Sequence, residues 1–381
     1  MDKAESKPAA KSGAGLEGVV AAESAIGDVD GVNGVLIYQG LNIHDLAEHS
    51  TFEETVYLLW HGRLPKRDEL DALRRELAAS QRLPEEVVAL MRGFPAEAEP
   101  MDALRTAVSA LAFYDPGARD LSREGALRTA TRLTAQFPVV VAAFGRLRKG
   151  LEPVEPRADF NLASNFLYML KGEEPDGREA RIFDACLVLH ADHELNASTF
   201  TSRVIAGTLA DMYGAVTGAI AALSGPLHGG ANTNVMKMLL EIGEPARADG
   251  WLREALASRK KIMGFGHRVY KTEDPRSVWL RKFSRELAEA KGETRWIEIL
   301  ERLRELMFAE KKLYPNVDYY SGSAYYLMGI PLDLFTPIFA VSRISGWTGH
   351  VLEQYANNRL IRPRAEYIGP RDVPYVPIDE R

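Results

Sequence analysis

Cysteine is almost absent from the chain, since Cys186 is the single cysteine among 381 residues. One cysteine cannot form an internal disulfide, so the fold cannot depend on such a bond. Cys186 lies between Ala185 and Leu187 in an apolar stretch. The sequence therefore predicts a buried, chemically inert thiol and fits a reducing compartment such as the cytoplasm.

A strong excess of one charge is also lacking, because 47 Lys and Arg residues stand against 53 Asp and Glu residues, a net charge of -6. This small acidic excess argues against non-specific binding of nucleic acid. It leaves room for a local basic pocket that holds phosphates or carboxylates.

Long uninterrupted apolar runs are missing as well. The most apolar long segment, 204–223, contains Asp211 and three glycines, Gly207, Gly214 and Gly218. This composition disfavours a membrane span and favours closely packed helices in a core or a subunit interface. Residues 1–14 lack the apolar run of a signal peptide and the arginines of a transit peptide, and we expect a disordered tail there.

What the sequence does contain is a repeated helical pattern. The length suggests about two domains. Turn dipeptides and β-branched residues between Asp28 and Gly40 predict a small hairpin. The segment from Thr51 to Glu54 has the form of a helix capping box, and the apolar helical spacing after it stops at Gly62. Proline and glycine separate further helical segments, so the sequence predicts a large all-α protein.

Three short segments interrupt the helical pattern with a titratable residue beside glycines or at a helix start. In the first, Gly229 and Gly230 follow His228 and allow a ligand or backbone to approach the imidazole closely. Taken alone, this segment also fits a tight turn at a helix entry.

The second segment runs from Met263 to Arg276 and places His267 with Arg268, Lys271 and Arg276 in one glycine-containing loop. Such a loop can present backbone N–H groups and cations to phosphates or carboxylates. It matches neither a Walker loop nor a complete Rossmann fingerprint, so a purely structural loop is the alternative.

The third segment, 314–322, contains Asp318 ahead of an apolar helical run. Alone, Asp318 fits a turn or N-cap residue. His190 and His193 form a His-x-x-His pair without a convincing third ligand, so we expect no metal site. Arg343 and Arg362 follow a strongly apolar stretch and, alone, fit surface arginines.

Taken together and in this order, these segments resemble the citrate synthase family from about Gly15 to the C-terminus. The resemblance rests on five motifs: FEETVYLLWHGRLP at 52–65, LHGGAN at 227–232, GFGHRVYKTEDPR at 264–276, PNVDYYSG at 315–322 and FAVSRISGW at 339–347. It implies a mostly α-helical homodimer with a minor N-terminal hairpin. The large domain would cover 15–229 and 330–381, and a smaller helical domain would cover 230–329, with the active site in the cleft between them.

The resemblance also implies roles for individual residues. His228, His267 and Asp318 match the family's catalytic triad. The residues that match its oxaloacetate ligands are His193, Arg276, Arg343 and Arg362, with Arg362 contributed by the partner subunit. Arg268 and Lys271 are candidate contacts for the phosphates of coenzyme A.

The implied reaction joins the methyl carbon of acetyl-CoA to the keto carbon of oxaloacetate and releases citrate and CoA. A thioester methyl is a very weak carbon acid, so Asp318 would remove its proton while His228 stabilises the charge on the thioester oxygen. His267 would polarise the ketone. The implied substrates need no metal or redox cofactor, and neither nucleic acid nor a membrane is an expected partner.

Two other functions remain open from the sequence. A 2-methylcitrate synthase would share the fold and catalytic residues but prefer propionyl-CoA, and one methylene changes binding by only about 1–3 kcal/mol. A catalytically silent paralogue that binds CoA would be expected to lack a member of the triad, which is intact here. The larger, NADH-regulated hexameric forms carry an additional N-terminal domain, which we do not expect in this protein, so we expect the dimeric type.

Overall fold

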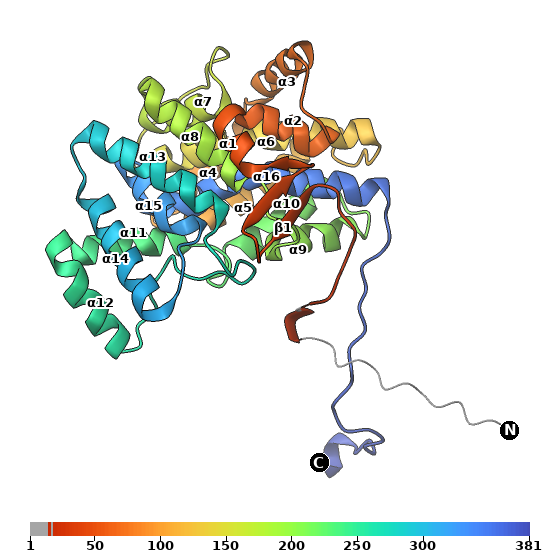
Figure 1. Cartoon of the computed structure of the whole chain (residues 1–381). Coiled ribbons are helices and arrows are strands. Elements are labelled where there is room, and N and C mark those ends of the chain that lie inside the picture. The colour runs from red at the N-terminus through yellow and green to blue at the C-terminus, as the bar shows by residue number, and fades with distance from the viewer. Residues whose placement is uncertain (1–13, 17) are drawn as a thin grey trace.

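Most of the chain is α-helical in the computed structural model, which describes residues 14–16 and 18–381, and the predicted fold class is confirmed (Figure 1). A small antiparallel sheet with the order β1-β2-β3 lies near the N-terminus; its strands are β1 (Gly27–Asp30), β2 (Val35–Tyr38) and β3 (Leu41–Asn42). Asp28 pairs with Ile37 and Asp30 with Val35, which confirms the predicted hairpin. Strand β3 extends it by one short strand.

The helices follow one another with short connections. Their bounds are α1 (Ile43–His49), α2 (Phe52–His61), α3 (Arg67–Ser80), α4 (Glu85–Arg92), α5 (Pro100–Leu111), α6 (Arg123–Leu147), α7 (Leu162–Lys171), α8 (Gly177–His190), α9 (Ala197–Ala206), α10 (Met212–Leu223), α11 (Ala231–Ile242), α12 (Ala248–Ala257), α13 (Pro275–Lys291), α14 (Arg295–Lys311), α15 (Val317–Leu327) and α16 (Phe335–Ala356), with 3-10 turns η1 (Ala14–Leu16), η2 (Ala112–Tyr114), η3 (Pro245–Arg247), η4 (Leu332–Leu334) and η5 (Ile378–Glu380).

Helix α2 shows how local sequence sets these bounds. The Thr51 side chain accepts a hydrogen bond from the backbone of Glu54, and the Glu54 side chain accepts one from the backbone of Thr51, so the predicted capping box is present. The helix ends at Gly62, which adopts a left-handed conformation with φ of 74°. Glycine accepts this conformation without the strain that a Cβ atom would bring.

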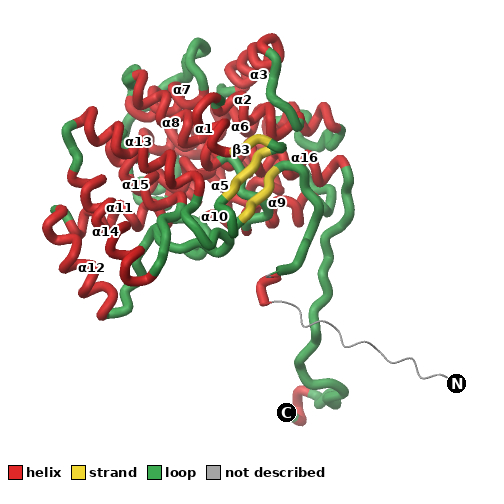
Figure 2. The backbone as a smooth tube through the Cα atoms, in the orientation of Figure 1, coloured by secondary structure: helices red, strands yellow, loops and turns green. Residues whose placement is uncertain are grey.

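Two long helices form the centre of the molecule. Helices α6 and α16 pack against each other and are buried along most of their length. A helix that is apolar on all sides belongs in a core. Helices α2, α8, α9 and α10 pack on α16 (Figure 2). Most of its polar residues, including Arg343, are therefore buried. Cys186 is buried in α8, as predicted.

The apolar segment 204–223 is divided between α9 and α10, which pack closely together. A Cβ atom on Gly218 would lie 2.2 Å from Cδ1 of Ile205, so glycine is required for this approach. The prediction of closely packed helices for this segment is confirmed. Across the described residues, no helix has the length and apolar character needed to cross a membrane.

Helices α11 to α15 gather on one side of the molecule (Figure 1). Helix α15 packs against α13 and α11, and α12 against α14. The group spans nearly the range expected for a small domain, but the division into domains at 230 and 329 stays a prediction.

After α16 the chain leaves the body as an extended segment, 357–381, which we call the C-terminal arm (Figure 1). Most of its residues are exposed. The disordered tail predicted for residues 1–14 lies outside the described residues, except for Ala14, which begins η1.

Candidate active site

Backbone pairing places the His267 loop beside the start of α15. Phe265 and Pro315 form an antiparallel β-bridge, and the backbone N–H of Asn316 donates to the carbonyl of Gly264 at 2.9 Å. Gly264 has φ of +81°, and a Cβ atom there would lie 2.6 Å from the ring of Tyr319. Only glycine allows this loop to lie so close to α15.

Asn316 is the residue that begins α15. Its side chain accepts from the backbone N–H of Asp318 at 3.0 Å and donates to the carbonyl of Gly266 at 2.9 Å. The cap of α15 is therefore Asn316, and the interpretation of Asp318 as the N-cap is wrong. Because Asn316 caps the helix, the Asp318 carboxylate in its first turn is available for chemistry.

Two fixed donors determine which nitrogen of His267 carries the proton. The backbone N–H groups of Val269 and Tyr270 both point at His267 Nδ1, at 3.0 and 3.2 Å. A backbone N–H can only donate, so Nδ1 accepts and the neutral ring carries its proton on Nε2. Burial, followed by the charge of Arg276, lowers the pKa of His267 to about 4, so the ring is neutral at pH 7.

His228 has the opposite arrangement. It lies in a turn between α10 and α11, as the structural interpretation of this segment predicted, and the backbone N–H of Ser198 donates to its Nε2 at 3.2 Å. Ser198 Oγ lies 2.8 Å from the same atom and accepts from Trp347 Nε1 at 3.1 Å. The proton of His228 is therefore on Nδ1. Burial and the charge of Arg343 lower its pKa to about 4.

The carboxyl group of Asp318 has a raised pKa, which makes its carboxylate a stronger base. Burial raises its pKa from 3.8 to about 6, while Arg276 and Arg343 act in the opposite direction and Asp274 adds to the rise. The side chain keeps partial exposure to solvent. At pH 7 the group is ionised, and its basicity exceeds that of an ordinary aspartate.

Two buried arginines lie among these groups. Arg276, near the start of α13, donates from Nε and Nη2 to the carboxylate of Asp274, with a closest distance of 2.6 Å. Arg343, on α16, donates from Nε to the carbonyl of His190 at 2.8 Å. Burial lowers the pKa of Arg343 to about 10, which leaves it cationic at pH 7.

The fourth group beside the arginines is His193, in the turn that follows α8. Its Nε2 lies 3.2 Å from the hydroxyl of Tyr270, and its ring centroid lies 5.2 Å from that of His267. Burial, then the charge of Arg276, lowers the pKa of His193 well below its ordinary value.

Six of the predicted residues therefore share one region. The charge of Arg343 acts on His193, His228 and Asp318, and that of Arg276 acts on His193, His267 and Asp318. Residues far apart in the sequence converge here, as the resemblance required. Their individual roles stay predictions.

Three predicted residues are outside this cluster. Arg362 lies exposed on the C-terminal arm, which extends away from the body. Arg268 and Lys271 are exposed in the loop after His267, and the backbone N–H of Lys271 donates to Gly31 at 2.7 Å.

Comparison with known proteins decides the family. Residues 15–364 match the family model described as citrate synthase, C-terminal domain. The chain belongs to the citrate synthase family. It is 54% identical to citrate synthase 2 of Bacillus subtilis, over 96% of this chain and 98% of that protein. It is 43% identical to the citrate/2-methylcitrate synthase of the same organism, over 94% and 96%.

A solved structure of the family has the same fold. The ternary complex of carboxymethyl coenzyme A and oxaloacetate with citrate synthase from Thermoplasma acidophilum superposes with a TM-score of 0.91 at 34% identity, covering 97% of this chain and 99% of that one. The predicted membership in the citrate synthase family is confirmed, and so is the fold.

Two cavities of this citrate synthase family member lie away from the cluster. One, of about 740 Å³, lies between α3 and the start of α7 and includes Glu53 and Arg74 in its lining. The other, of about 490 Å³, lies near the ends of α6 and α7 and includes Lys291 and Tyr326. None of the predicted site residues lines either cavity, so convergence of side chains, rather than cavity volume, defines this site.

Sequence reasoning missed several residues that hold the site together. Asp274 lies within the motif GFGHRVYKTEDPR without an assigned role, although an acidic residue two positions before an arginine is a recognisable local pair. Ser198 and Asn316 are short polar residues at helix starts, which the N-cap rules could have identified. The contact of Ser198 with His228 has no signal in the sequence, since 30 residues separate the two.

Proposed function

We propose that this site condenses acetyl-CoA with oxaloacetate and water to give citrate and CoA, the activity of the citrate synthase family. One observation carries the assignment of roles: two neutral imidazoles, one with its proton on Nδ1 and one on Nε2, lie in one cluster with a carboxylate of pKa about 6. The reaction needs one base and two neutral hydrogen-bond donors.

The first step forms the nucleophile. The Asp318 carboxylate takes a proton from the thioester methyl group, and the C–H electron pair becomes the C=C bond of an enol. His228 donates its Nδ1–H to the thioester oxygen, where the charge develops. A neutral histidine suits this role because its pKa is lowered to about 4.

The second step joins the carbon atoms. The enol carbon attacks the keto carbon of oxaloacetate while the thioester C=O bond forms again and its oxygen returns the proton to His228 Nδ1. The electron pair of the keto C=O moves to oxygen, which receives a hydrogen bond and then a proton from His267 Nε2–H, and His267 regains a proton from water. Water then adds to the thioester of citryl-CoA, and CoA leaves as the thiol. Orienting the two reactants can supply about 7–11 kcal/mol of the barrier.

His193, Arg276 and Arg343 would hold oxaloacetate. The substrate carries two carboxylates, and guanidinium groups bind carboxylates through paired hydrogen bonds. Both arginines remain cationic although they are buried. Arg268 and Lys271, exposed beside His267, would contact the phosphates of CoA.

Acetyl-CoA is the proposed acyl donor, and propionyl-CoA is the second candidate because relatives of the chain include a citrate/2-methylcitrate synthase. The test is oxaloacetate-dependent release of CoA thiol from each donor. We expect a higher kcat/KM with acetyl-CoA, and the reverse order would favour 2-methylcitrate synthase. Absence of thiol release from both donors would favour a silent CoA-binding paralogue.

The same assay tests the proposal that no metal or redox cofactor takes part. Dialysis against EDTA should leave the rate unchanged, and a loss of activity that added metal restores would overturn this proposal.

A cytoplasmic location is proposed because the Cys186 thiol is buried and unpaired, which suits a reducing compartment.

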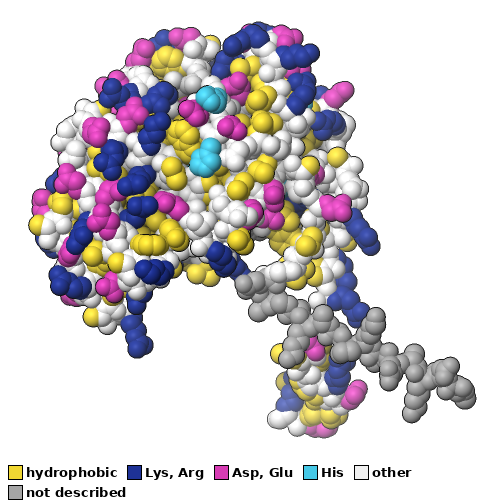
Figure 3. All heavy atoms as spheres, viewed as in Figure 1, with side chains coloured by type: hydrophobic (Ala, Val, Ile, Leu, Met, Phe, Trp, Pro, Cys, Tyr) yellow, Lys and Arg dark blue, Asp and Glu magenta, His cyan; other side chains and the backbone are white. Residues whose placement is uncertain are grey.

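A homodimer is proposed because the C-terminal arm needs a partner. The space-filling view shows apolar and basic side chains on the arm, outside the body (Figure 3). The large apolar side chains that the arm exposes are those of Leu360, Tyr367, Ile368, Val373, Tyr375 and Ile378. A patch of this kind marks a contact surface. Arg362, at the start of the arm, would complete the oxaloacetate site of the partner subunit.

Mixed dimers test this arrangement. Asp318→Asn and Arg362→Gln chains should each be nearly inactive alone. In a mixed dimer, the Arg362→Gln body has an intact triad and receives Arg362 from the other chain, so one site in two is complete. Refolding the two chains together should restore activity. If Arg362 acted within its own chain, every site would be damaged and the mixture would stay inactive.

A further inference from the structure

A buried hydrogen-bonded pair, His350 and Asp192, lies directly behind the site. His350 Nε2 is 3.1 Å from Asp192 Oδ1, and both side chains are 0% exposed. The reaction scheme above uses neither residue. Burying such groups is unfavourable unless they are paired, and here each group satisfies the other.

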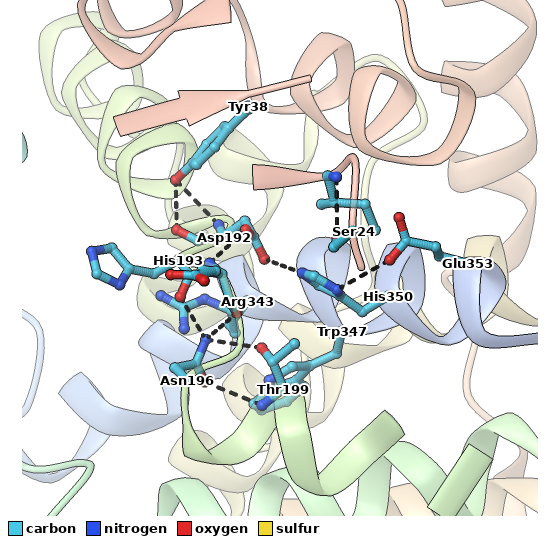
Figure 4. A network of polar contacts seen from close by, with 12 residues as sticks. Ser24, Tyr38, Asp192, His193, Asn196, Thr199, Arg343, Trp347, His350 and Glu353 are labelled. Atoms are coloured by element: carbon cyan, nitrogen blue, oxygen red, sulfur yellow. Dashed lines mark hydrogen bonds and ion pairs between the residues drawn. The ribbon is translucent and has the colours of Figure 1, made fainter. Parts of the chain in front are cut away.

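Figure 4 shows what surrounds this pair. Asp192 lies between Tyr38 and His350, while the His193 imidazole points the other way. The tyrosine hydroxyl donates to the backbone carbonyl of Asp192 at 2.9 Å. Asp192, the residue before the proposed ligand His193, is thus held on both sides.

Asp192 also organises the turn that carries His193. Its Oδ2 accepts from the backbone N–H of Glu194 at 3.0 Å. Glu194 has φ of 52°, a left-handed conformation that is unfavourable for a residue with a Cβ atom. The Asp192 carboxylate therefore holds the residue that follows His193, and His350 orients that carboxylate.

Helix α16 contacts this turn at three successive places. Arg343 donates to the carbonyl of His190 at 2.8 Å. A Cβ atom on Gly346 would lie 2.4 Å from the carbonyl oxygen of Ala191, so the backbones approach as closely as glycine permits. His350 reaches Asp192. The helix that carries one proposed oxaloacetate ligand is thereby fixed to the turn that carries another.

The tautomer of His350 follows from its other neighbour. Arg203, on α9, lies with Nη1 3.4 Å from His350 Nδ1, and a guanidinium can only donate. His350 Nε2–H therefore donates to Asp192. Glu353 Oε2 is 3.9 Å from Nδ1. Burial by itself would raise the pKa of Asp192, but His350 and Arg343 outweigh this effect. The pKa is therefore lowered, and the carboxyl group is ionised.

We propose that His350 is a positioning residue for oxaloacetate binding: through Asp192 it fixes the His193 turn against α16 and so sets the spacing between His193 and Arg343. The inference rests on the proposed function, in which these two residues bind oxaloacetate. His350 itself does not touch the substrate. Its loss should therefore impair oxaloacetate binding far more than acetyl-CoA binding.

The test compares His350→Leu with His350→Gln. Leucine removes the donor to Asp192, and we expect the KM for oxaloacetate to rise about tenfold or more, as for a lost hydrogen bond to a charged group, with the acetyl-CoA KM changed less than about twofold. Glutamine can place an amide N–H near the position of Nε2–H. We expect it to bring the oxaloacetate KM to within about threefold of the wild type.

Thr348→Val is the matched control. Thr348 lies on the same helix, is equally buried, and accepts from Trp60 Nε1 at 2.9 Å instead of contacting the His193 turn. It should lower the melting temperature without changing the oxaloacetate KM. If His350→Leu behaves like Thr348→Val, or raises both KM values together, the positioning role is overturned.

Two further variants separate the possible failures. Asp192→Asn keeps the shape of the side chain but can accept from only one of its two donors, so it should also raise the oxaloacetate KM, and it replaces His350→Leu if that chain does not fold. His193→Ala tests the underlying assignment. An unchanged oxaloacetate KM in His193→Ala would refute the ligand assignment, whereas a raised KM there with normal values in the Asp192 and His350 variants would refute positioning alone.

Discussion

At the scale of single residues, the chemistry depends on how burial changes proton affinity. Asp318, His228 and His267 are enclosed in the same region, yet burial acts on them with opposite sign. It raises the pKa of the acid and lowers that of the imidazoles, because it disfavours whichever form is charged. The result is a stronger base next to two neutral donors.

Replacing Asp318 by asparagine should therefore lower activity and raise stability. We expect kcat to fall about 10²–10⁴-fold, the usual contribution of a general base. The folded-state pKa of about 6 exceeds the ordinary 3.8, so the ionised group destabilises the fold above pH 6 by about 1–3 kcal/mol. Urea unfolding should show Asp318→Asn more stable than wild type at pH 8 and equal to it near pH 4.

Asp333→Asn is the control of opposite sign. The hydrogen bond from Arg148 lowers the pKa of Asp333, so its loss should destabilise the protein at pH 8.

The wild-type kcat/KM for acetyl-CoA should fall about tenfold per pH unit below about pH 6 as Asp318 becomes protonated. A flat profile down to pH 5 would remove Asp318 as the base.

At the scale of elements, the site depends on where α15 begins. Its N-cap, Asn316, satisfies the backbone of Asp318 and the carbonyl of Gly266 at the same time. One side chain thus fixes both the residue proposed as the base, Asp318, and the loop that carries His267.

Asn316→Ala should show this double role. Loss of an N-cap destabilises a helix by about 1 kcal/mol, and here it should also lower kcat about tenfold because Asp318 and His267 lose their common support. Asn161→Ala is the matched control, since Asn161 caps α7 in the same way by accepting from Ser164 at 2.8 Å. It should lower stability similarly and leave kcat unchanged. Equal kcat values for the two variants would contradict this role.

At the scale of the whole molecule, the site is assembled from two sets of helices. His267, Arg276 and Asp318 belong to the part of the chain from α11 to α15, while His193 and Arg343 come from the turn after α8 and from α16. A substrate held by both sets links them. Closure of one set over the other would exclude water while the enol exists.

Oxaloacetate should therefore bind first and strengthen the binding of acetyl-CoA. Calorimetric titration should show at least about fivefold tighter binding of an unreactive acetyl-CoA analogue when oxaloacetate is present. Arg343→Gln is the control: oxaloacetate should neither bind to it well nor affect the second ligand. Equal affinities for the analogue with and without oxaloacetate in the wild type would disprove the coupling.

The sequence by itself determined the features that depend on neighbouring residues. The hairpin, the capping box at Thr51 and the burial of Cys186 follow from patterns a few residues long. The family followed from motifs of the same kind, and it supplied the names of the residues that converge in the site. These patterns are local, so they can be read without coordinates.

Only the tertiary structure decided how those residues are held. The proton positions of His228 and His267 follow from backbone donors that folding brings to them, and Asn316 rather than Asp318 caps α15. The contact between Asp192 and His350 joins residues 158 positions apart. Helix packing creates such contacts, and no spacing in the sequence encodes them, because each side chain finds its partner on a different element.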